Sequence, residues 1–162
     1  MSTPVSPLAA LVFLLGGGVA GFVAAVAMDV PMNRQPEGWT PAWLAAATVR
    51  RTTPDAIPFR DATVAHHGAG ILAGASYGLL TGVLGLVVPS PAFGGVSVVG
   101  HLGAVGLVTL FVYGFFAHFV LPRVGGQVYE ERATAVRGQW LRSALTFAVV
   151  MTVAGPLLLV LF

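Results

Sequence analysis

The chain contains no cysteine, no lysine and very little charge. Asp, Glu, Lys and Arg together make up only 9% of the 162 residues, whereas a typical soluble domain carries about 25%. The lack of cysteine excludes disulfide bonds, thiolate metal ligands and cysteine nucleophiles. Hydrophobic residues make up 56% of the chain, which excludes both a soluble enzyme and a disordered chain. We therefore expect an all-α integral membrane protein.

Four apolar runs are long enough to cross a bilayer as helices, which takes about 20 residues. They cover about residues 8–30, 64–88, 95–121 and 140–162. Pro31 and Pro122 follow the first and third runs, where a proline can end a helix without breaking internal hydrogen bonds. The pattern predicts four transmembrane helices in one bundle, and a single domain over residues 1–162.

A shorter helix is expected in the first long loop, over about residues 41–51. Thr40 followed by Pro41 is a typical helix start, with Thr as the N-cap and Pro in the first helical position. Trp39 and Trp43 are the amphipathic aromatic residues found at lipid headgroup depth. We predict a cytoplasmic interfacial helix, while a plain helical connector fits the same residues equally well.

All eight basic residues are arginines, and they fall in the two long loops and nowhere else. Cytoplasmic loops of membrane proteins carry an excess of Lys and Arg. We therefore expect residues 29–63 and 122–142 to face the cytoplasm, and both termini to lie outside the plasma membrane. Nucleic acid is not an expected partner, because the arginines form no clustered basic face.

Small residues predict how the helices meet, because membrane helices associate by close backbone approach. In the first span they are Gly17, Gly21 and Ala25; in the second, Gly70, Gly74 and Gly78 with Gly82 and Gly85; in the third, Gly100, Gly103, Ala104 and Gly114. Spans one to three are therefore expected to form a tight sub-bundle. Span four has bulkier side chains, and we expect it to face lipid or a partner more than the others.

Four ionisable groups are expected at one depth, near the cytoplasmic interface. Asp29 ends the first span, His66 and His67 begin the second, and His118 precedes the end of the third. At about 100° per residue, His67 shares the glycine face of its helix while His66 points about 100° away. Asp29 and His118 also lie on small-residue faces. His101 is alone at the outer level and is interpreted as structural.

These groups allow three uses besides simple interfacial placement. Neutral imidazoles and a carboxylate suit zinc or iron, with Asp29, His66, His67 and His118 as candidate ligands. His67 and His118 can instead provide the two axial nitrogens of a haem. A proton relay is the third use. Interfacial histidines without any ligand are more common than all three together.

The sequence predicts a small polytopic membrane protein, first of all a non-enzymatic subunit or scaffold of a larger membrane assembly. Its expected partners are the lipid bilayer and either other membrane subunits or further copies of itself. A haem- or metal-binding bundle with a site at the cytoplasmic interface is the alternative. A small transporter or proton-conducting subunit is the second alternative.

Overall fold

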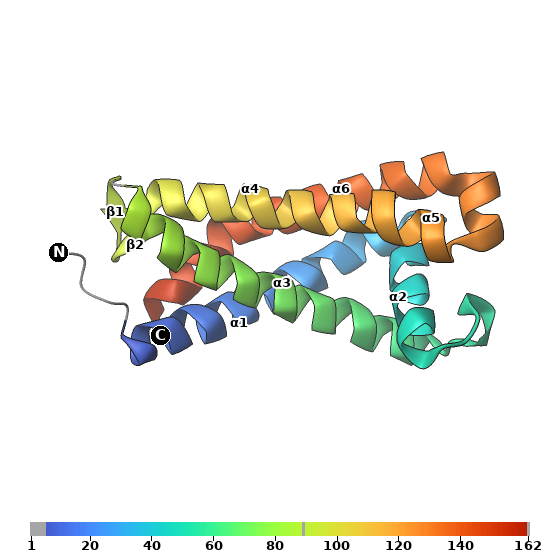
Figure 1. Cartoon of the computed structure of the whole chain (residues 1–162), viewed down its shortest axis with the longest axis horizontal. Helices are drawn as coiled ribbons and strands as arrows, with labels where there is room; N and C mark the ends of the chain where they lie inside the picture. The colour runs from blue at the N-terminus through green and yellow to red at the C-terminus, as the bar shows by residue number, and fades with distance from the viewer. Residues whose placement is uncertain (1–5, 89, 162) are drawn as a thin grey trace.

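The structure, a computed structural model, describes residues 6–88 and 90–161 as a bundle of long antiparallel helices (Figure 1). Four helices in this described part are long and apolar enough to cross a membrane. They are α1 (Pro7–Asn33), α3 (Phe59–Val87), α4 (Val98–Phe115), which continues through the π-helix η2 (Phe116–Val120) and α5 (Leu121–Val124), and α6 (Gly126–Leu161). Helix α1 packs against α3 and α6, and α4 closes the bundle by packing against the same two helices.

The predicted spans coincide with these four helices, but the helices extend beyond the apolar runs. Helix α3 begins at Phe59 instead of near residue 64, and α6 begins at Gly126 instead of near residue 140. The prediction that Pro31 and Pro122 end their helices is wrong, because Pro31 lies inside α1 and Pro122 is followed by Arg123 and Val124 in α5. Polar residues outside an apolar run are often good helix formers, so hydropathy alone underestimates helix length.

A tight hairpin joins α3 to α4 through strands β1 (Ala92–Phe93) and β2 (Val96–Ser97). Gly94 and Gly95 form the turn with φ angles of 54° and 85°, a left-handed conformation that glycine adopts without strain. Ser97 then caps α4 by accepting a hydrogen bond from the Gly100 N–H. The hairpin thus keeps α3 and α4 side by side.

The expected short helix is α2 (Thr40–Arg50), and it lies across the long axis of the bundle (Figure 1). The 3₁₀ turn η1 (Pro54–Ala56) leads from it to α3. The predicted cap is wrong, because Trp39 is the N-cap residue and the Thr40 hydroxyl donates to Glu37 Oε2 at 2.7 Å. The buried Glu37 also accepts a hydrogen bond from Arg132 of α6 at 2.7 Å. This ion pair ties the loop before α2 to α6.

Glycines hold α1 against α3, as the small-residue spacing predicts. A Cβ atom added at Gly21 would lie 2.6 Å from the Gly74 Cα, and one at Gly74 would lie 2.5 Å from the Gly21 Cα. A Cβ at Gly17 would meet the Gly74 carbonyl and lie 3.0 Å from the Gly78 Cα. Because no real Cβ contact is this short, only glycine permits the observed approach of the two backbones.

The expectations for the third and fourth spans are wrong in part. Helix α4 approaches α3 at Gly100, where a Cβ would lie 3.0 Å from the Gly85 nitrogen, and at Gly103, where it would lie 3.3 Å from Leu84 Cδ1; a Cβ at Gly106 or Gly114 would meet no described atom within 4 Å. Helix α6 faces outward more than α1 and the α4–α5 span but not more than α3: 28% of the most apolar stretch is buried in α6 and in α3, against 33% in the α4–α5 span and 44% in α1. Between α4 and α6, larger side chains pack against one another in place of glycines. The buried residues of α6 recur at helical spacing: Val136, Trp140, Ser143, Ala144, Phe147, Met151, Gly155 and Leu159.

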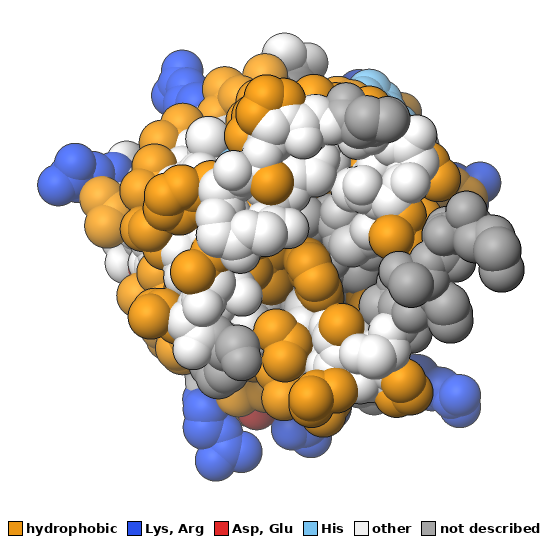
Figure 2. Space-filling view, turned by 90° about the vertical axis from the view of Figure 1, so that its left-hand side faces the viewer, with side chains coloured by type: hydrophobic (Ala, Val, Ile, Leu, Met, Phe, Trp, Pro, Cys, Tyr) orange, Lys and Arg blue, Asp and Glu red, His pale blue; other side chains and the backbone are white. Residues whose placement is uncertain are grey.

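Charge is confined to one end of the bundle. The arginines all lie away from the β1–β2 hairpin, on the loops, near helix ends or in the N-terminal half of α6. Figure 2 looks onto the hairpin end, where hydrophobic and uncharged side chains face the viewer and arginine side chains appear only around the rim. The two ends therefore differ strongly in charge, as the sequence predicts. We call the arginine-bearing end the basic end.

Candidate metal site

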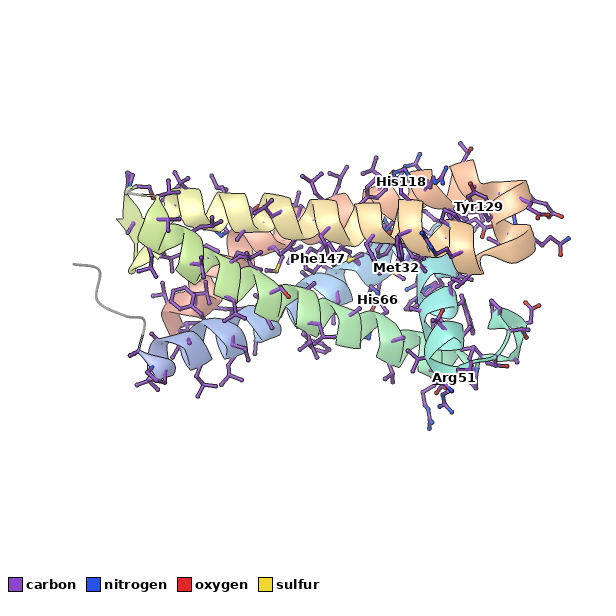
Figure 3. All side chains as sticks on the ribbon, viewed as in Figure 1. Met32, Arg51, His66, His118, Tyr129 and Phe147 are labelled. Atoms are coloured by element: carbon purple, nitrogen blue, oxygen red, sulfur yellow. The ribbon has the colours of Figure 1, made fainter. Side chains whose placement is uncertain are left out.

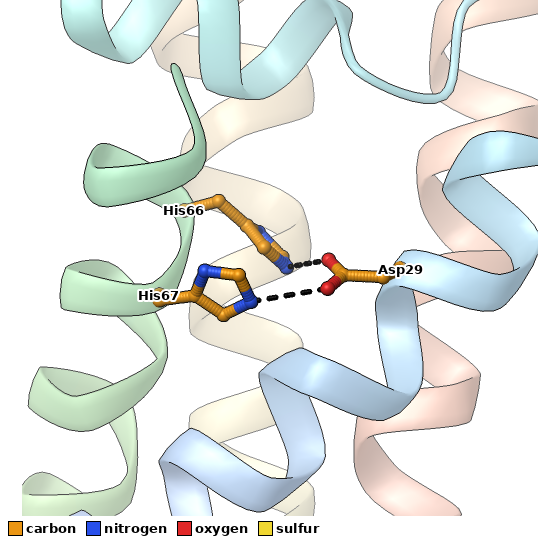
Figure 4. A group of neighbouring side chains, drawn as sticks. All are labelled: Asp29, His66 and His67. Carbon is orange, nitrogen blue, oxygen red and sulfur yellow. Dashed lines mark hydrogen bonds and ion pairs between the residues drawn. The ribbon is translucent and has the colours of Figure 1, made fainter. Parts of the chain in front are cut away.

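Helices α1 and α3 bring Asp29, His66 and His67 together near the basic end (Figure 4). The Oδ2 atom of Asp29 lies 3.1 Å from Nε2 of His67, and its Oδ1 atom lies 3.4 Å from Nε2 of His66. Each residue offers one ligand atom, and these three atoms lie within 4.8 Å of one another. The cluster thus contains three of the four metal ligands proposed from the sequence.

The glycine contact between α1 and α3 positions this cluster. Gly70 of α3 faces Ala25 of α1, and a Cβ at Gly70 would lie 2.5 Å from the Ala25 Cβ. Asp29 follows Ala25 by one helical turn, and His67 precedes Gly70 by about one turn. Because the helices are antiparallel, extending the contact by one turn on each makes Asp29 and His67 meet.

His66 also reaches the cluster, although its helix position predicts that it points away. Its side chain is buried, and its Nε2 atom lies 3.0 Å from the Ala25 carbonyl oxygen. The Trp39 ring covers it in an edge contact, with ring centroids 5.6 Å apart. The angle on a helical wheel gives the direction of Cβ only, and a long side chain beneath a covering loop can still turn toward the neighbouring helix.

The protonation of the two histidines follows from their partners. The Ala25 carbonyl can only accept a hydrogen bond, so Nε2 of His66 carries a hydrogen and donates it. An ionised Asp29 likewise accepts from Nε2 of His67. A metal ion bound at these nitrogens must therefore replace both hydrogens, either by their release or by their transfer to Nδ1.

The residues fit a small metal ion. Bonds of about 2.0–2.2 Å place two ligand atoms of a tetrahedral site about 3.4 Å apart. The two imidazoles lie 3.1 and 3.4 Å from different oxygens of Asp29, and one ligand atom from each residue lies within 4.8 Å of the others, so metal binding would require the three side chains to move slightly closer together. Asp29 Oδ1 is buried and accepts no hydrogen bond from any described residue. A buried carboxylate oxygen in this state is costly unless a cation or a donor satisfies it. Two imidazoles and one carboxylate form a ligand set that zinc and ferrous iron both accept.

The fourth proposed ligand, His118, lies apart from the cluster. It is exposed on η2, and its ring makes an edge contact with Tyr113, with centroids 6.0 Å apart. Figure 3 shows His118 at the upper edge of the molecule and His66 near its middle. The structure therefore does not form the His67–His118 pair on which the haem hypothesis depends, and it leaves three metal ligands instead of four.

His118 lies apart from the cluster because of the face through which α4 packs. The small-residue rule predicts that α4 packs through Gly100, Gly103, Ala104 and Gly114. Helix α4 does bury Gly100 and Ala104, but it also buries His101, Val105 and Val108, which shifts the centre of the buried face. This face is rotated by roughly a quarter turn from the predicted one, given about 100° per residue. His118 therefore lies outside the bundle interior.

A second polar contact, between two residues that the sequence does not pair, lies nearer the hairpin end. The Tyr77 hydroxyl lies 2.8 Å from His101 Nδ1, and His101 Nε2 lies 3.1 Å from the Thr152 carbonyl oxygen, so His101 links three helices. Gly155 makes room for the tyrosine, because a Cβ there would lie 2.5 Å from the Tyr77 hydroxyl oxygen. The expectation that His101 is alone at its level is wrong, because the Tyr77 hydroxyl lies beside it; both ring nitrogens are engaged between helices, as a structural role requires. The sequence offers one signal for this contact: Tyr77 and His101 both place a polar group within an apolar helix.

Comparison with known proteins adds no relative: no family model, curated protein or solved structure matches the chain.

Proposed function

We propose that this chain is a multi-pass membrane protein that binds one transition-metal ion through Asp29, His66 and His67. The convergence of one carboxylate and two imidazoles, all within 4.8 Å, is the observation that supports this function best. The buried Asp29 Oδ1 atom, which lacks a hydrogen bond from the described residues, supports it further. Such a site leaves at least one coordination position for water or another ligand.

The proposed setting is the plasma membrane, with the metal site on the cytoplasmic side. The four apolar helices support the membrane location. The arginine asymmetry supports the orientation, with both termini outside. Helix α2, which lies across the bundle axis with Trp39 and Trp43 near its start, then lies at the lipid headgroups.

This proposal does not require catalysis. A non-enzymatic subunit or scaffold of a membrane assembly, built from this chain with other subunits or further copies of itself, can carry such a metal ion. Movement of the ion across the membrane, the transporter hypothesis, would need a path beyond the three ligands. Metal uptake by proteoliposomes that contain the purified protein would support it.

The test is metal binding by purified wild type and two histidine variants. We expect the wild type to bind one Zn²⁺ or Co²⁺ per chain. His67→Ala should weaken binding by more than about 100-fold, because even residues that only orient a ligand are worth 10–100-fold. His118→Ala is the matched control, since it removes an exposed imidazole outside the cluster, and it should bind as the wild type does.

Trp39 provides a direct optical readout. Its ring lies against His66, so paramagnetic Co²⁺ in the cluster should quench its fluorescence. Trp39→Phe, which leaves Trp43 and Trp140, should remove most of the quenching without removing the metal. Equal Co²⁺ affinity in the wild type and His67→Ala would overturn the proposed site.

A further inference from the structure

The outer face of the third apolar helix carries a ladder of stacked aromatic rings. Phe111 stacks on Phe115 with ring centroids 5.4 Å apart and an interplanar angle of 15°. Phe115 stacks on Phe119 at 5.1 Å and 18°. All three rings are exposed on the bundle surface. The ladder runs along the helix toward the basic end and finishes at Arg123, whose guanidinium carbon lies 3.6 Å from the Phe119 centroid.

Pro122 lies where the helix widens, and its missing N–H leaves a carbonyl to be satisfied. In the π-helix η2 the Leu121 N–H bonds to the Phe116 carbonyl, five residues back. The next bond in this register would run from residue 122 to Ala117, but proline has no N–H. Arg137 of α6 supplies the missing donor, and its Nε lies 2.9 Å from the Ala117 oxygen. Single π-helical turns often occur at functional sites.

Arg123 is held in place but is not neutralised. Its Nη1 donates to the Phe119 carbonyl at 3.1 Å, and its guanidinium lies on the Phe119 ring. It makes no ion pair with a carboxylate in the described part of the chain, and its side chain is exposed. Its remaining N–H groups are free to bind an anion, and the planar guanidinium matches two phosphate oxygens.

We propose that Arg123 and the Phe111–Phe115–Phe119 ladder form a binding site for one anionic phospholipid. The phosphate pairs with Arg123, and an acyl chain lies along the exposed rings. Charge complementarity supports this occupant: an unpaired guanidinium stands at the end of an apolar strip, as a phosphate stands at the end of an acyl chain. The inference depends on the proposed membrane location, but not on the metal site.

The test compares Arg123→Gln with Arg142→Gln. Both arginines are exposed at the basic end and make no ion pair within residues 6–88 and 90–161. The variants therefore lose the same charge, but of these two arginines only Arg123 lies on an aromatic ring of the described residues. Native mass spectrometry of detergent-purified protein would count bound phosphatidylglycerol, with phosphatidylcholine as the uncharged comparison.

We expect Arg123→Gln to weaken phosphatidylglycerol binding by about fivefold or more, the effect of one basic residue at an anionic surface. Arg142→Gln should weaken it by less than about twofold. Phe119→Leu should also weaken it, because the guanidinium loses its support. Equal loss in both arginine variants, or no loss in either, would overturn the site. Zinc content measured on the same samples should be unchanged in Arg123→Gln, which separates a failure here from a failure of the metal site.

Discussion

At the scale of single residues, the protein places its polar groups in pairs between helices. Asp29 meets His67, and Tyr77 meets His101. The sequence predicts the first meeting, because both residues continue the small-residue contact of α1 and α3. It does not predict the second, because no residue of another helix is expected at the level of His101 and the sequence assigns Tyr77 no partner. Polar partners could thus be predicted only across the contact that glycines define.

Tyr77→Phe should lower the free energy of unfolding by about 1 kcal/mol, because it leaves His101 Nδ1 without a partner. Thermal unfolding in detergent would measure the change. Tyr113→Phe is the matched control, because the Tyr113 hydroxyl makes no hydrogen bond with another described residue and only its ring contacts His118. Equal melting temperatures for the two variants would show that the Tyr77–His101 contact contributes little.

At the scale of the elements, glycine decides which helices approach closely. The α1–α3 contact is predicted from spacing because the same four-residue repeat occurs on both helices. A Cβ at Gly17, Gly21, Gly74 or Gly78 would meet backbone atoms of the other helix. The α4–α6 contact is not predicted. It is formed by residues such as Val108 and Phe147, and valine and phenylalanine are equally common on helix faces exposed to lipid. Hydropathy does not distinguish lipid from a neighbouring helix as surroundings.

Gly74→Ala should destabilise the bundle by about 1–3 kcal/mol, the usual cost of over-packing. The added Cβ would lie 2.5 Å from the Gly21 Cα, so the backbones must separate. Gly106→Ala makes the same chemical change on α4, where no described atom lies within 4 Å of the new Cβ. It should not destabilise the protein, because alanine favours helix more than glycine. Comparable destabilisation of the two variants in detergent would mean that α1 and α3 do not meet through these glycines.

At the scale of the whole molecule, the sequence predicts the number and order of the apolar helices and the charged end. It does not predict where the helices end, since α6 begins far outside its apolar run and η2 appears where a helix end was expected. In the sequence, Pro122 is compatible with the end of a helix and with a widened helical turn. The Arg137 contact with the Ala117 carbonyl, which favours the widened turn, is visible only in the structure.

The proposed orientation predicts which introduced cysteines are accessible from outside the cell. Because the chain has no cysteine of its own, all labelling comes from the introduced residue. Ala92→Cys, at the hairpin end, should react with a membrane-impermeant maleimide added to intact cells. Thr53→Cys, at the basic end, should react only after the membrane is opened. Both positions are exposed in the structure. Labelling of Thr53→Cys alone in intact cells would reverse the orientation and place the metal site outside.

The central claim is that Asp29, His66 and His67 form one metal site. Zn²⁺ titration of the purified protein, followed by equilibrium dialysis and metal analysis, tests it most directly. We predict one tightly bound ion per chain in the wild type and in His118→Ala, and none in Asp29→Ala or His67→Ala when these variants remain folded. A wild type that retains no zinc, or four proteins that retain the same amount, would contradict the account.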